Sequence, residues 1–430
     1  MQQLHQIIVV GGGAGGLELV TQLGEQFGKT QKAAVTLVDH SLTHVWKPLL
    51  HEIAVGTLDV HQEETNYFAH GAKHGYQFVL GSMLGVDREQ KQLLIQPKKV
   101  SDSRSPQTAP PIKLSYDTLV IAIGSQSNDF NTTGVKEFCH FLDTAEQAQI
   151  FHRDLLNLYL DAQASPEARD LNIAIVGAGA TGVELAAELM DARHRFALYG
   201  LNKIDPEQVS VSLIEASNRI LPALSEKTAK HTHKQLEQLG VQVLTQHRVT
   251  AVDAEQLHFA DGSQLPAQIK VWAAGIKAPA LLKDLDGLET DHLNRLKVYA
   301  TLQTTEDANI FAFGDCALCQ PTADQPPLGP RAQVASQQAS FLVRALRIRL
   351  NGGLLPMFRF SEKGSLVSLS QRTAIGEILG QVNVQGVLAR AMYMSLHRLH
   401  QANIHGFTQA GLITAKDLVS KKMAPKIKLH

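Results

Sequence analysis

Residues 6–39 read QIIVVGGGAGGLELVTQLGEQFGKTQKAAVTLVD, and this stretch decides the fold. A short β-branched run ends at Val10 and leads into Gly11-Gly12-Gly13-Ala14-Gly15-Gly16. A helix-like stretch to about Phe27 follows, and an apolar run then closes on Asp39. A strand, a glycine turn, a helix and a second strand in this order predict a parallel βαβ unit.

A second stretch repeats this design. Asn172–Val176 leads into Gly177-Ala178-Gly179-Ala180-Thr181-Gly182, a helical Val183–Met190 and the strand Val209–Ile214, which ends at Glu215. A single GxGxxG is a weak signal, because glycine turns before helices are common. Here it occurs twice, each time with its strand, its helix and its downstream acid, so the sequence predicts two dinucleotide-binding units.

The residue types in these two turns suit the binding of a dinucleotide. The first glycine of each turn makes the tight bend, the second admits a pyrophosphate close to the backbone, and the third lets the helix pack on the strand. The helix N-terminus supplies free N–H donors and a positive dipole end to the phosphates. Asp39 and Glu215 can accept hydrogen bonds from an adenosine ribose, and an acid there repels a 2′-phosphate, so the second site should prefer NADH to NADPH.

Composition narrows the class of protein. The 430 residues are 44% hydrophobic and 19% charged, which suits a globular chain of two or three domains. No stretch approaches the roughly 20 apolar residues that span a bilayer, and no signal peptide is evident. The three cysteines are too few for a secreted disulfide framework, so a reducing, cytoplasmic setting is expected.

The net charge of −1 conceals an uneven distribution. From residue 386 to the C-terminus seven Lys and Arg face one Asp, a sum of +6, so the other 385 residues carry −7. An acidic body with a basic tail is therefore predicted, and no nucleic-acid partner is expected.

Three further segments complete an α/β organisation. Thr118–Gly124, Lys270–Gly275 and Asn309–Asp315 are apolar runs that end in or near a glycine, as strands before a turn do, and Arg331–Leu350 should be a helix. We expect residues 1–145 and 295–375 to form one discontinuous domain, 146–294 a second domain inserted in it, and 376–430 a C-terminal helical region.

Together these motifs resemble the flavoprotein disulfide reductases of the glutathione-reductase type, which hold two Rossmann-like domains. Four stretches more narrowly resemble the type II NADH:quinone oxidoreductases, and the resemblance extends over nearly the whole chain. They are HVWKPLL at 44–50, VWAAG at 271–275, FGDCA at 313–317 and AQVASQ at 332–337. The last is the most specific, because the fold does not demand it.

The resemblance implies a reaction and a location. FAD would be held non-covalently in the first domain, and NADH would bind the second. Hydride would pass from NADH to FAD, and two electrons would then reduce a membrane quinone without proton pumping. It implies a respiratory enzyme lying on the cytoplasmic face of the cell membrane, and a homodimer is common in the family.

The resemblance also implies roles for individual residues. It places Asp39 and Met83 at the FAD adenosine, Asp315 at the ribityl chain, and Ala332 with Lys363 at the isoalloxazine. The full set of predicted cofactor-binding residues is Gly11, Gly12, Gly13, Ala14, Gly15, Gly16, Asp39, His40, Lys47, Met83, Gly124, Gly177, Gly179, Gly182, Glu184, Glu215, Gly275, Asp315, Ala332, Gln333 and Lys363. The predicted catalytic residues are Glu184, Gln333, Gln337 and Lys363, with both glutamines beside the quinone headgroup.

Each catalytic assignment has a plainer alternative. A reduced flavin carries negative charge, which the N-terminus of helix 331–350 or Lys363 could balance, but Lys363 could equally be an ordinary exposed lysine. Gln333 and Gln337 share a helical face and could donate to quinone carbonyls, or they could simply face solvent. Glu184 is expected in the first turn of its helix, and the resemblance implies that it lies near the nicotinamide. The plainer alternative is that the helix dipole alone stabilises an acid at this position.

The cysteines and histidines predict no metal. Cys316 and Cys319 form a CxxC, which can be a redox dithiol. The resemblance favours a packed structural thiol, because disulfide reductases of this kind place their cysteines after the first unit's second strand or within the NAD unit, residues 44–54 contain none, and Cys316 belongs to the family's GDCA run. The 19 histidines are scattered without a ligand spacing.

The tail mixes apolar residues such as Leu396 and Phe407 with cationic ones, which suits a helix lying in the membrane interface beside anionic lipid. A docked C-terminal helix or a dimer contact is the alternative. For the activity, a sulfide:quinone oxidoreductase, a soluble NADH-dependent flavin reductase and a non-catalytic NADH-sensing flavoprotein remain open.

Overall fold

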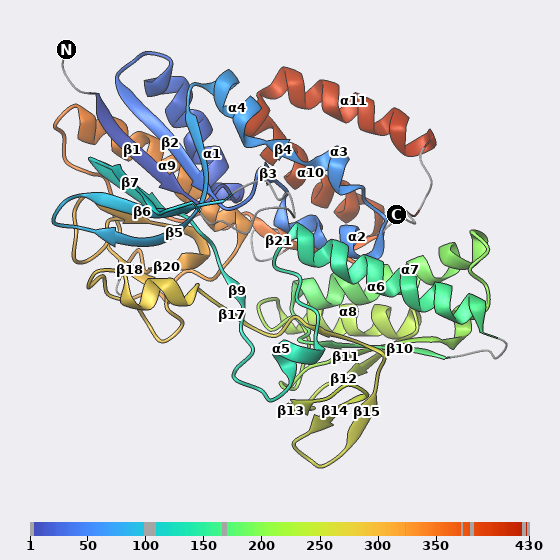
Figure 1. The fold of residues 1–430 in the computed structure, drawn as a ribbon. Helices are drawn as coiled ribbons and strands as arrows, with labels where there is room; N and C mark the ends of the chain where they lie inside the picture. The colour runs from blue at the N-terminus through green and yellow to red at the C-terminus, as the bar shows by residue number, and fades with distance from the viewer. Residues whose placement is uncertain are drawn as a thin grey trace.

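The computed structural model describes residues 4–98, 109–165, 170–322, 324–370, 373–378, 382–423 and 427, without the side chains of residues 418 and 420–423. Two separate sheets, one mixed and one parallel, organise the chain, each flanked by helices (Figure 1). The first of the two C-terminal helices contacts the first helix of the chain, and the second packs on the first. The expected α/β class is confirmed.

The first sheet is built on the quoted N-terminal stretch. Its strand order is β19-β8-β1-β2-β5-β6-β7, parallel from β19 to β5 and antiparallel beyond. The strands are β1 His5–Val10, β2 Ala33–Asp39, β5 Gln77–Asp87, β6 Gln92–Pro97, β7 Ile112–Ser115, β8 Thr118–Ile121 and β19 Ile310–Ala312. All four residues of β8 are buried, as a central parallel strand requires.

Helices α1 Ala14–Leu23 and α9 Ala332–Leu350 pack against each other beside this sheet, although more than 300 residues separate them. A Cβ added at Gly15 would lie 3.1 Å from the Ala335 Cβ, so the two helices meet closely there. The predicted helix 331–350 is confirmed, with Arg331 as its N-cap.

The second sheet has the order β12-β11-β10-β16, all parallel. Its strands are β10 Leu171–Val176, β11 Val209–Ile214, β12 Val241–Leu244 and β16 Ile269–Trp272. The adjoining helices are α6 Ala145–Ala164, α7 Ala180–Leu198 and α8 Glu226–Gln238. Helix α7 extends well beyond the predicted Val183–Met190.

Two short strands, β9 Gln126–Ser127 and β17 Ile276–Lys277, pair where the chain passes between the sheets. His140 bridges to Val271 of the second sheet, and Leu282 belongs to the apolar core of the first. The domain limits at residues 145 and 294 stay a prediction.

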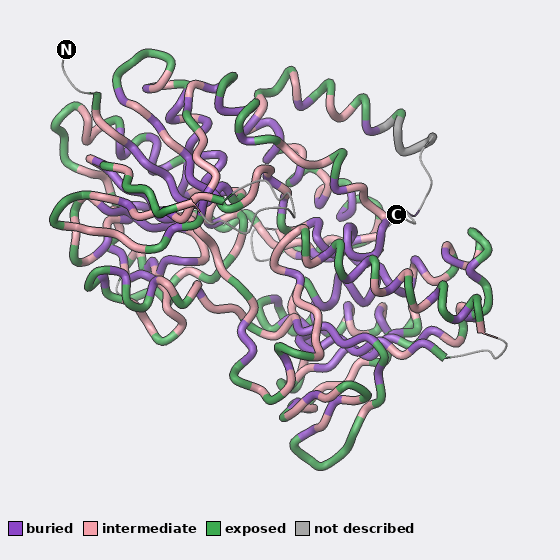
Figure 2. Tube along the Cα trace, viewed as in Figure 1, coloured by how far each residue is buried: buried purple, intermediate pink, exposed green. Residues whose placement is uncertain are grey.

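The C-terminal part begins with a three-stranded antiparallel sheet and ends in two helices. The elements are β21 Gly364–Ser368, β22 Ala374–Ile378, β23 Val382–Gln385, α10 Gly386–His405 and α11 Phe407–Met423. Figure 2 shows buried positions concentrated in the two sheets and their facing helices, whereas α11 is mostly exposed or intermediate. Helix α10 is more buried, with Tyr393 and His400 in its inner face.

The smaller elements support the loops around the sites. They are β3 Thr43–His44, α2 Leu50–Val55, α3 Val60–Glu63, β4 Thr65–Asn66, α4 Tyr67–His74, α5 Val135–Phe138, β13 Val249–Val252, β14 Gln256–Phe259, β15 Gln264–Pro266, β18 Leu296–Val298 and β20 Ala317–Cys319. No helix in the described part of the chain has the length and hydropathy needed to span a bilayer.

Candidate functional site

The first glycine turn has the geometry that its sequence predicts. Gly11 has φ +100°, and Gly16 lies so close to it that an added Cβ would sit 1.8 Å from the Gly11 carbonyl oxygen. A Cβ at Gly13 would meet nothing within 4 Å. The turn is therefore closed on its inner side and open on the outer side, where a pyrophosphate would approach.

The acid at the end of β2 is fixed to this turn. The Gly12 N–H donates to Asp39 Oδ2 at 2.6 Å, and the Ser41 N–H donates to Asp39 Oδ1 at 2.8 Å. Helix α1 has no side-chain cap, so its first N–H groups remain available to a phosphate. His40 is exposed beside Asp39, and Met83 is buried on β5.

The second turn repeats each of these features. Gly177 has φ +105°, and a Cβ at Gly182 would lie 2.0 Å from the Gly177 carbonyl oxygen. Gly179 faces open space and is the uncapped N-cap of α7. Glu215 accepts the Ala178 N–H at 3.0 Å. Both turns thus present an open glycine, a free helix end and a positioned carboxylate, which fits one dinucleotide at each.

A polar cluster lies around Asp315, at the carboxyl ends of the strands of the first sheet. Ser125 Oγ donates to Asp315 Oδ2 at 3.0 Å, and Lys47 Nζ donates to the Ser125 carbonyl at 3.1 Å. Burial raises the pKa of Asp315, while the Ser125 hydroxyl partly offsets this. Gly124 has φ +69° with open space at its Cβ position. Lys47, Gly124 and Asp315, predicted separately, are brought together here.

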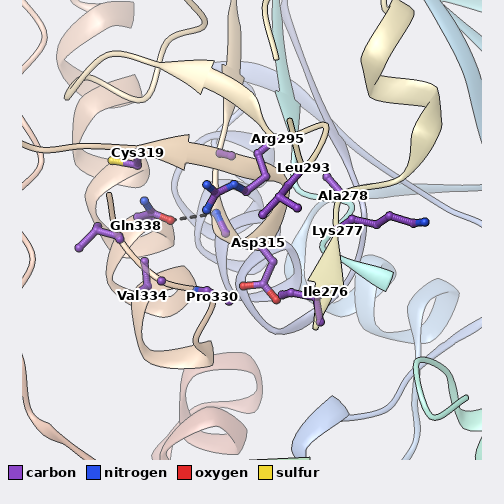
Figure 3. A pocket seen from close by; sticks show the side chains of 14 residues that line it. Ile276, Lys277, Ala278, Leu293, Arg295, Asp315, Cys319, Pro330, Val334 and Gln338 are labelled. Carbon is purple, nitrogen blue, oxygen red and sulfur yellow. Dashed lines mark hydrogen bonds between the residues drawn. The ribbon is translucent and has the colours of Figure 1, made fainter. Parts of the chain in front are cut away.

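Figure 3 shows the other side of Asp315, where Ile276, Val334 and Gln338 line a cavity of about 50 Å³. The Gly314 N–H donates to Gln338 Oε1 at 2.8 Å, so a buried glutamine of α9 fixes the Gly314 turn. The cavity has room for water rather than a ring system. Sequence reasoning missed Gln338, although it directly follows the predicted Gln337.

The N-terminal part of α9 gathers three predicted residues. Gln337 exchanges two hydrogen bonds with the backbone of Ser361, at 2.8 and 3.0 Å. Gln333 Oε1 accepts the Lys363 N–H at 3.4 Å. Ala332 is exposed in the first turn of α9, which has no side-chain cap. Both glutamine side chains therefore hold segment 361–363 in this structure, and Lys363 is exposed beside them.

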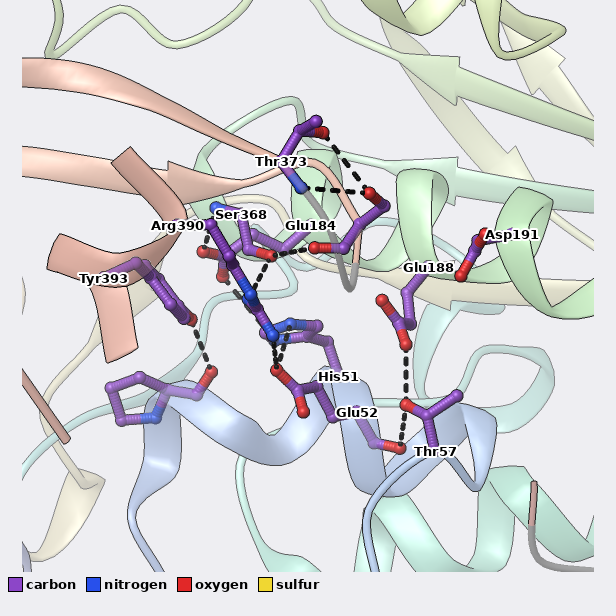
Figure 4. A network of polar contacts seen from close by, with 12 residues as sticks. His51, Glu52, Thr57, Glu184, Glu188, Asp191, Ser368, Thr373, Arg390 and Tyr393 are labelled. Carbon is purple, nitrogen blue, oxygen red and sulfur yellow. Dashed lines mark hydrogen bonds and ion pairs between the residues drawn. The ribbon is translucent and has the colours of Figure 1, made fainter. Parts of the chain in front are cut away.

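Glu184 lies in a buried polar network, which Figure 4 shows. Its Oε1 accepts the Ser368 N–H at 3.0 Å, and its Oε2 lies 3.6 Å from His51 Nδ1. Burial raises the pKa of Glu184, and His51 opposes this rise. The expected first-turn position is wrong, because α7 begins at Ala180 and Glu184 is its fifth residue. Its environment is a packed interior rather than a helix end.

The same network ties three parts of the chain together. Arg390 of α10 donates to Ser368 Oγ at 2.7 Å and to Glu52 Oε1 of α2 at 3.2 Å. Thr57 donates to Glu188 Oε1 of α7 at 2.6 Å. Sequence reasoning grouped Arg390 with the cationic tail, whereas it is buried. The signals that could have found the network are acids placed inside apolar helical runs.

The remaining predicted residues have simpler surroundings. Gly275 has φ +60° and lies under the Phe130 ring. Cys316 and Cys319 are buried free thiols, and burial raises the pKa of each to about 11. Within the described residues, no group of three or more His, Cys, Asp or Glu could hold a metal ion. The side chains of Lys421 and Lys422, and residues Lys426 and Lys428, lie outside the described part.

Comparisons with known proteins add the family. The family described as pyridine nucleotide-disulphide oxidoreductase matches residues 5–339. A type II NADH:quinone oxidoreductase of Haemophilus influenzae is 41% identical, covering 99% of this chain and all of that protein. The structure of NDH2 from Plasmodium falciparum in complex with NADH matches with a TM-score of 0.79 at 20% identity, covering 96% and 98% of the two chains. The sulfide:quinone oxidoreductase of Aquifex aeolicus matches with a TM-score of 0.72 at 15% identity, covering 94% and 92%.

Proposed function

The chain belongs to the pyridine nucleotide-disulphide oxidoreductase family and, within it, to the type II NADH:quinone oxidoreductases; from this premise we propose how its residues oxidise NADH and reduce a quinone. FAD is the prosthetic group, held non-covalently at the first glycine turn, and NADH binds the second. The paired construction of the two turns, each with a carboxylate fixed to it, carries this proposal.

Bound FAD would supply a ring that accepts hydride and then releases two electrons. The chain's own residues hold the ring and balance the charge that it gains on reduction. The uncapped N-terminus of α9 would offer about half a positive charge to a reduced ring bound beside it. Lys363, whose backbone N–H donates to Gln333, would add a full charge if its exposed side chain turned toward the ring.

At the NADH side, Glu184 is the residue that we place near the nicotinamide. Because burial raises its pKa, it can remain a neutral acid over a wider pH range than an exposed glutamate. A neutral acid can donate a hydrogen bond to the nicotinamide amide without leaving a full negative charge in the interior. Its contact with the Ser368 N–H orients it toward β21.

We place the quinone beside Gln333 and Gln337. Their amide groups are bonded to segment 361–363, so a quinone would either displace these bonds or bind against the surface that they order. The sulfide alternative has less support, because the Cys316 thiol is buried and donates to the Phe313 carbonyl at 3.3 Å.

The test is an anaerobic titration followed by addition of a soluble quinone. NADH should bleach the flavin absorbance with a 1:1 stoichiometry, and quinone should restore it. Bleaching by sulfide but not by NADH would instead establish the sulfide reaction. A flavin that NADH reduces but quinone does not reoxidise would leave a reductase for another acceptor.

We also propose that residues 1–145 with 295–375, and 146–294, are the FAD and NADH domains, and that 376–430 attaches the chain to the cytoplasmic face of the membrane. Large apolar side chains of α10 and α11 face outward, which supports a lipid contact. They are Val387, Leu388, Leu396, Leu399, Phe407, Leu412 and Val419. A homodimer could cover part of the same surface.

A truncation before α10 would remove buried contacts along with this surface, so substitutions test the membrane proposal better. Replacing Leu396, Leu399, Phe407 and Leu412 with serine should release the enzyme from anionic liposomes in a flotation assay while NADH still bleaches the flavin. The matched control replaces exposed Leu354 and Met357, which lie on the loop after α9. Unchanged flotation of the first variant would contradict the proposal.

A further inference from the structure

A chain of four hydrogen-bonded side chains runs through the interior beside the first glycine turn. His44 of β3 and His400 of α10 meet through their Nε2 atoms at 2.9 Å. The other nitrogen of His400, Nδ1, lies 2.7 Å from Glu18 Oε1 of α1. Ser336 Oγ of α9 donates to Glu18 Oε2 at 2.6 Å. Exposure is only 4% for His44, 5% for His400 and 2% for Glu18.

The direction of these bonds can be worked out from one end. The Gly12 carbonyl can only accept, so His44 Nδ1, which lies 3.0 Å from it, carries a hydrogen. Burial and the neighbouring His400 hold the pKa of His44 well below its ordinary value, so its Nε2 is a bare lone pair. His400 must then donate from its own Nε2.

This leaves the contact between His400 Nδ1 and Glu18 Oε1. A neutral His400 that donates from Nε2 has a bare Nδ1, and two lone pairs would then face each other at 2.7 Å. One hydrogen must therefore lie in the contact, either on an imidazolium beside a carboxylate or on a carboxylic acid beside a neutral imidazole. In both forms the pair stores one proton and has no net charge, which explains how an acid is tolerated at 2% exposure.

One end of this chain faces a cavity that opens to solvent. His44 and His400 line a cavity of about 340 Å³ between the β3–α4 segment and the C-terminal helices, with Lys73 and Lys416 among its exposed lining residues. A cavity of this size and polarity can hold many waters. All four ring nitrogens have partners in this arrangement, so reloading requires His400 to turn its Nδ1 into the cavity, take a proton from water there and turn back to Glu18.

The other end lies on the helix that carries the proposed quinone ligands. Ser336 follows Gln333 by three residues and precedes Gln337, so its hydroxyl lies on the adjoining part of the α9 surface. In this arrangement the Ser336 hydroxyl donates to Glu18, so the relay requires it to turn its hydrogen toward the quinone side of α9. It then accepts a hydrogen from Glu18 as it releases its own, and it holds no charge.

The proposed reaction needs a supply of protons. NADH, quinone and one proton give NAD⁺ and quinol, and the hydride brings both electrons but only one of the two hydrogens that the quinol gains. We propose that the Glu18–His400 pair, with His44 and Ser336, forms a proton relay from the cavity to the quinone side of α9; this rests on the proposed function. An O–H or N–H bond breaks within the pair, Ser336 Oγ exchanges its hydrogen, and an O–H bond forms on the quinol.

Several other titratable groups surround the relay and would influence its pH dependence. Glu63 of α3 lies 3.5 Å from His397 of α10, and His397 stacks on Trp46, which also stacks on His400. The remaining charged or titratable side chains that line the cavity are Glu64, His70, Lys73, His405 and Lys416. Positive charge on Lys73 or Lys416 would make loading of the pair harder, whereas the Glu64 carboxylate would make it easier.

The test separates the two halves of the reaction by stopped flow. Glu18→Gln keeps the shape and hydrogen bonds of the side chain but removes the acid. Ser336→Ala removes the hydroxyl that would pass the proton to the quinone. Either change should slow reoxidation of the reduced enzyme by quinone by about tenfold or more, because a positioned proton donor is worth ~10²–10⁴ in rate. Bleaching by NADH should stay unchanged, since hydride transfer takes no proton from solvent.

Glu63→Gln is the matched control, because it alters a second carboxylate–imidazole pair at the same cavity. Added imidazole buffer should restore reoxidation in Glu18→Gln, which a misfolded site would not allow. A readout without turnover is the proton NMR spectrum of the oxidised holoenzyme. A strongly downfield imidazole N–H signal should be lost in Glu18→Gln and kept in Glu63→Gln.

The outcomes are distinguishable. Failure of the unmodified enzyme to be bleached by NADH or reoxidised by quinone would refute the proposed function itself. Normal reoxidation in both Glu18→Gln and Ser336→Ala would overturn the relay while leaving that function intact. Loss of NADH bleaching in Glu18→Gln would also overturn the relay, because it would place Glu18 in cofactor binding.

Discussion

The contact between Arg390 and Glu52 allows a quantitative prediction for how the C-terminal helix is held. The two side chains lie 3.2 Å apart, are 9% and 5% exposed, and are 338 residues apart in the sequence. Replacing Arg390 with methionine keeps most of the volume but removes the cation that faces the Glu52 carboxylate. Breaking one side of a buried ion pair costs about 3–5 kcal/mol.

The expected loss can be converted into a temperature. Unfolding entropy is about 2.1 cal/mol/K per residue, or roughly 0.9 kcal/mol/K for this chain, so Arg390→Met should lower Tm by about 3–6 °C. The assay is calorimetry of the holoenzyme at one scan rate, with hydrogen exchange of α10 as a local readout. Exchange in α10 should rise more than in β1 or β10.

Two controls decide what the result means. Arg398 of the same helix pairs with Asp417 at 2.7 Å, and these side chains are 22% and 11% exposed, so Arg398→Met should cost less than Arg390→Met. The double variant Arg390→Met with Glu52→Gln should recover part of the loss, because no charge is then left buried. Equal Tm values for the Arg390 and Arg398 variants would refute the reasoning.

Two further predictions concern the sites, and a third concerns the ion pairs of Asp129. A Cβ at Gly16 would sit 1.8 Å from a carbonyl oxygen, and one at Gly182 would sit 2.0 Å from another. Gly16→Ala should therefore abolish FAD retention on gel filtration, whereas Gly182→Ala should keep the flavin but raise the KM for NADH. Loss of flavin from both variants would contradict separate sites. Glu184→Gln should slow flavin bleaching by NADH in stopped flow, and an unchanged rate would remove Glu184 from the reaction. Lys277 and Lys136 lower the pKa of Asp129 to about 2, so its stabilising effect is present above pH 4 and lost between about pH 4 and 2. The Tm difference between the unmodified chain and Asp129→Asn should therefore shrink on acidification, and a constant difference would contradict the assignment.

Local patterns predicted most of the strands and helices near the glycine turns. The predicted strand 209–214 coincides with β11, and helix 331–350 differs from α9 only at its N-cap. These elements follow from short-range periodicity, turn chemistry and capping, all of which a single sequence contains. The activity was also readable, because the motifs at 44–50 and 332–337 resemble one family.

Contacts between distant segments could not be predicted in the same way. Glu18 and Glu52 each stand within an apolar helical run, which marks them as unusual but does not say which residue meets them. Their partners His400 and Arg390 are 382 and 338 residues away. Periodicity has no information about such pairings, since they depend on how the C-terminal helix docks.

Docking of α10 also changes how the basic tail should be understood. The sequence gives residues 386–430 a sum of +6, but Arg390 is neutralised by Glu52 in the interior, and Arg398 is paired with Asp417. The positive charge left for a lipid surface is then that of the five lysines Lys416, Lys421, Lys422, Lys426 and Lys428, all beyond α10. At about 1 kcal/mol per lysine, attraction to anionic lipid would act at the end of the chain. Neutralising these lysines should therefore weaken liposome binding and leave the stability of α10 unchanged. Arg390→Met should instead destabilise α10 and leave liposome binding unchanged.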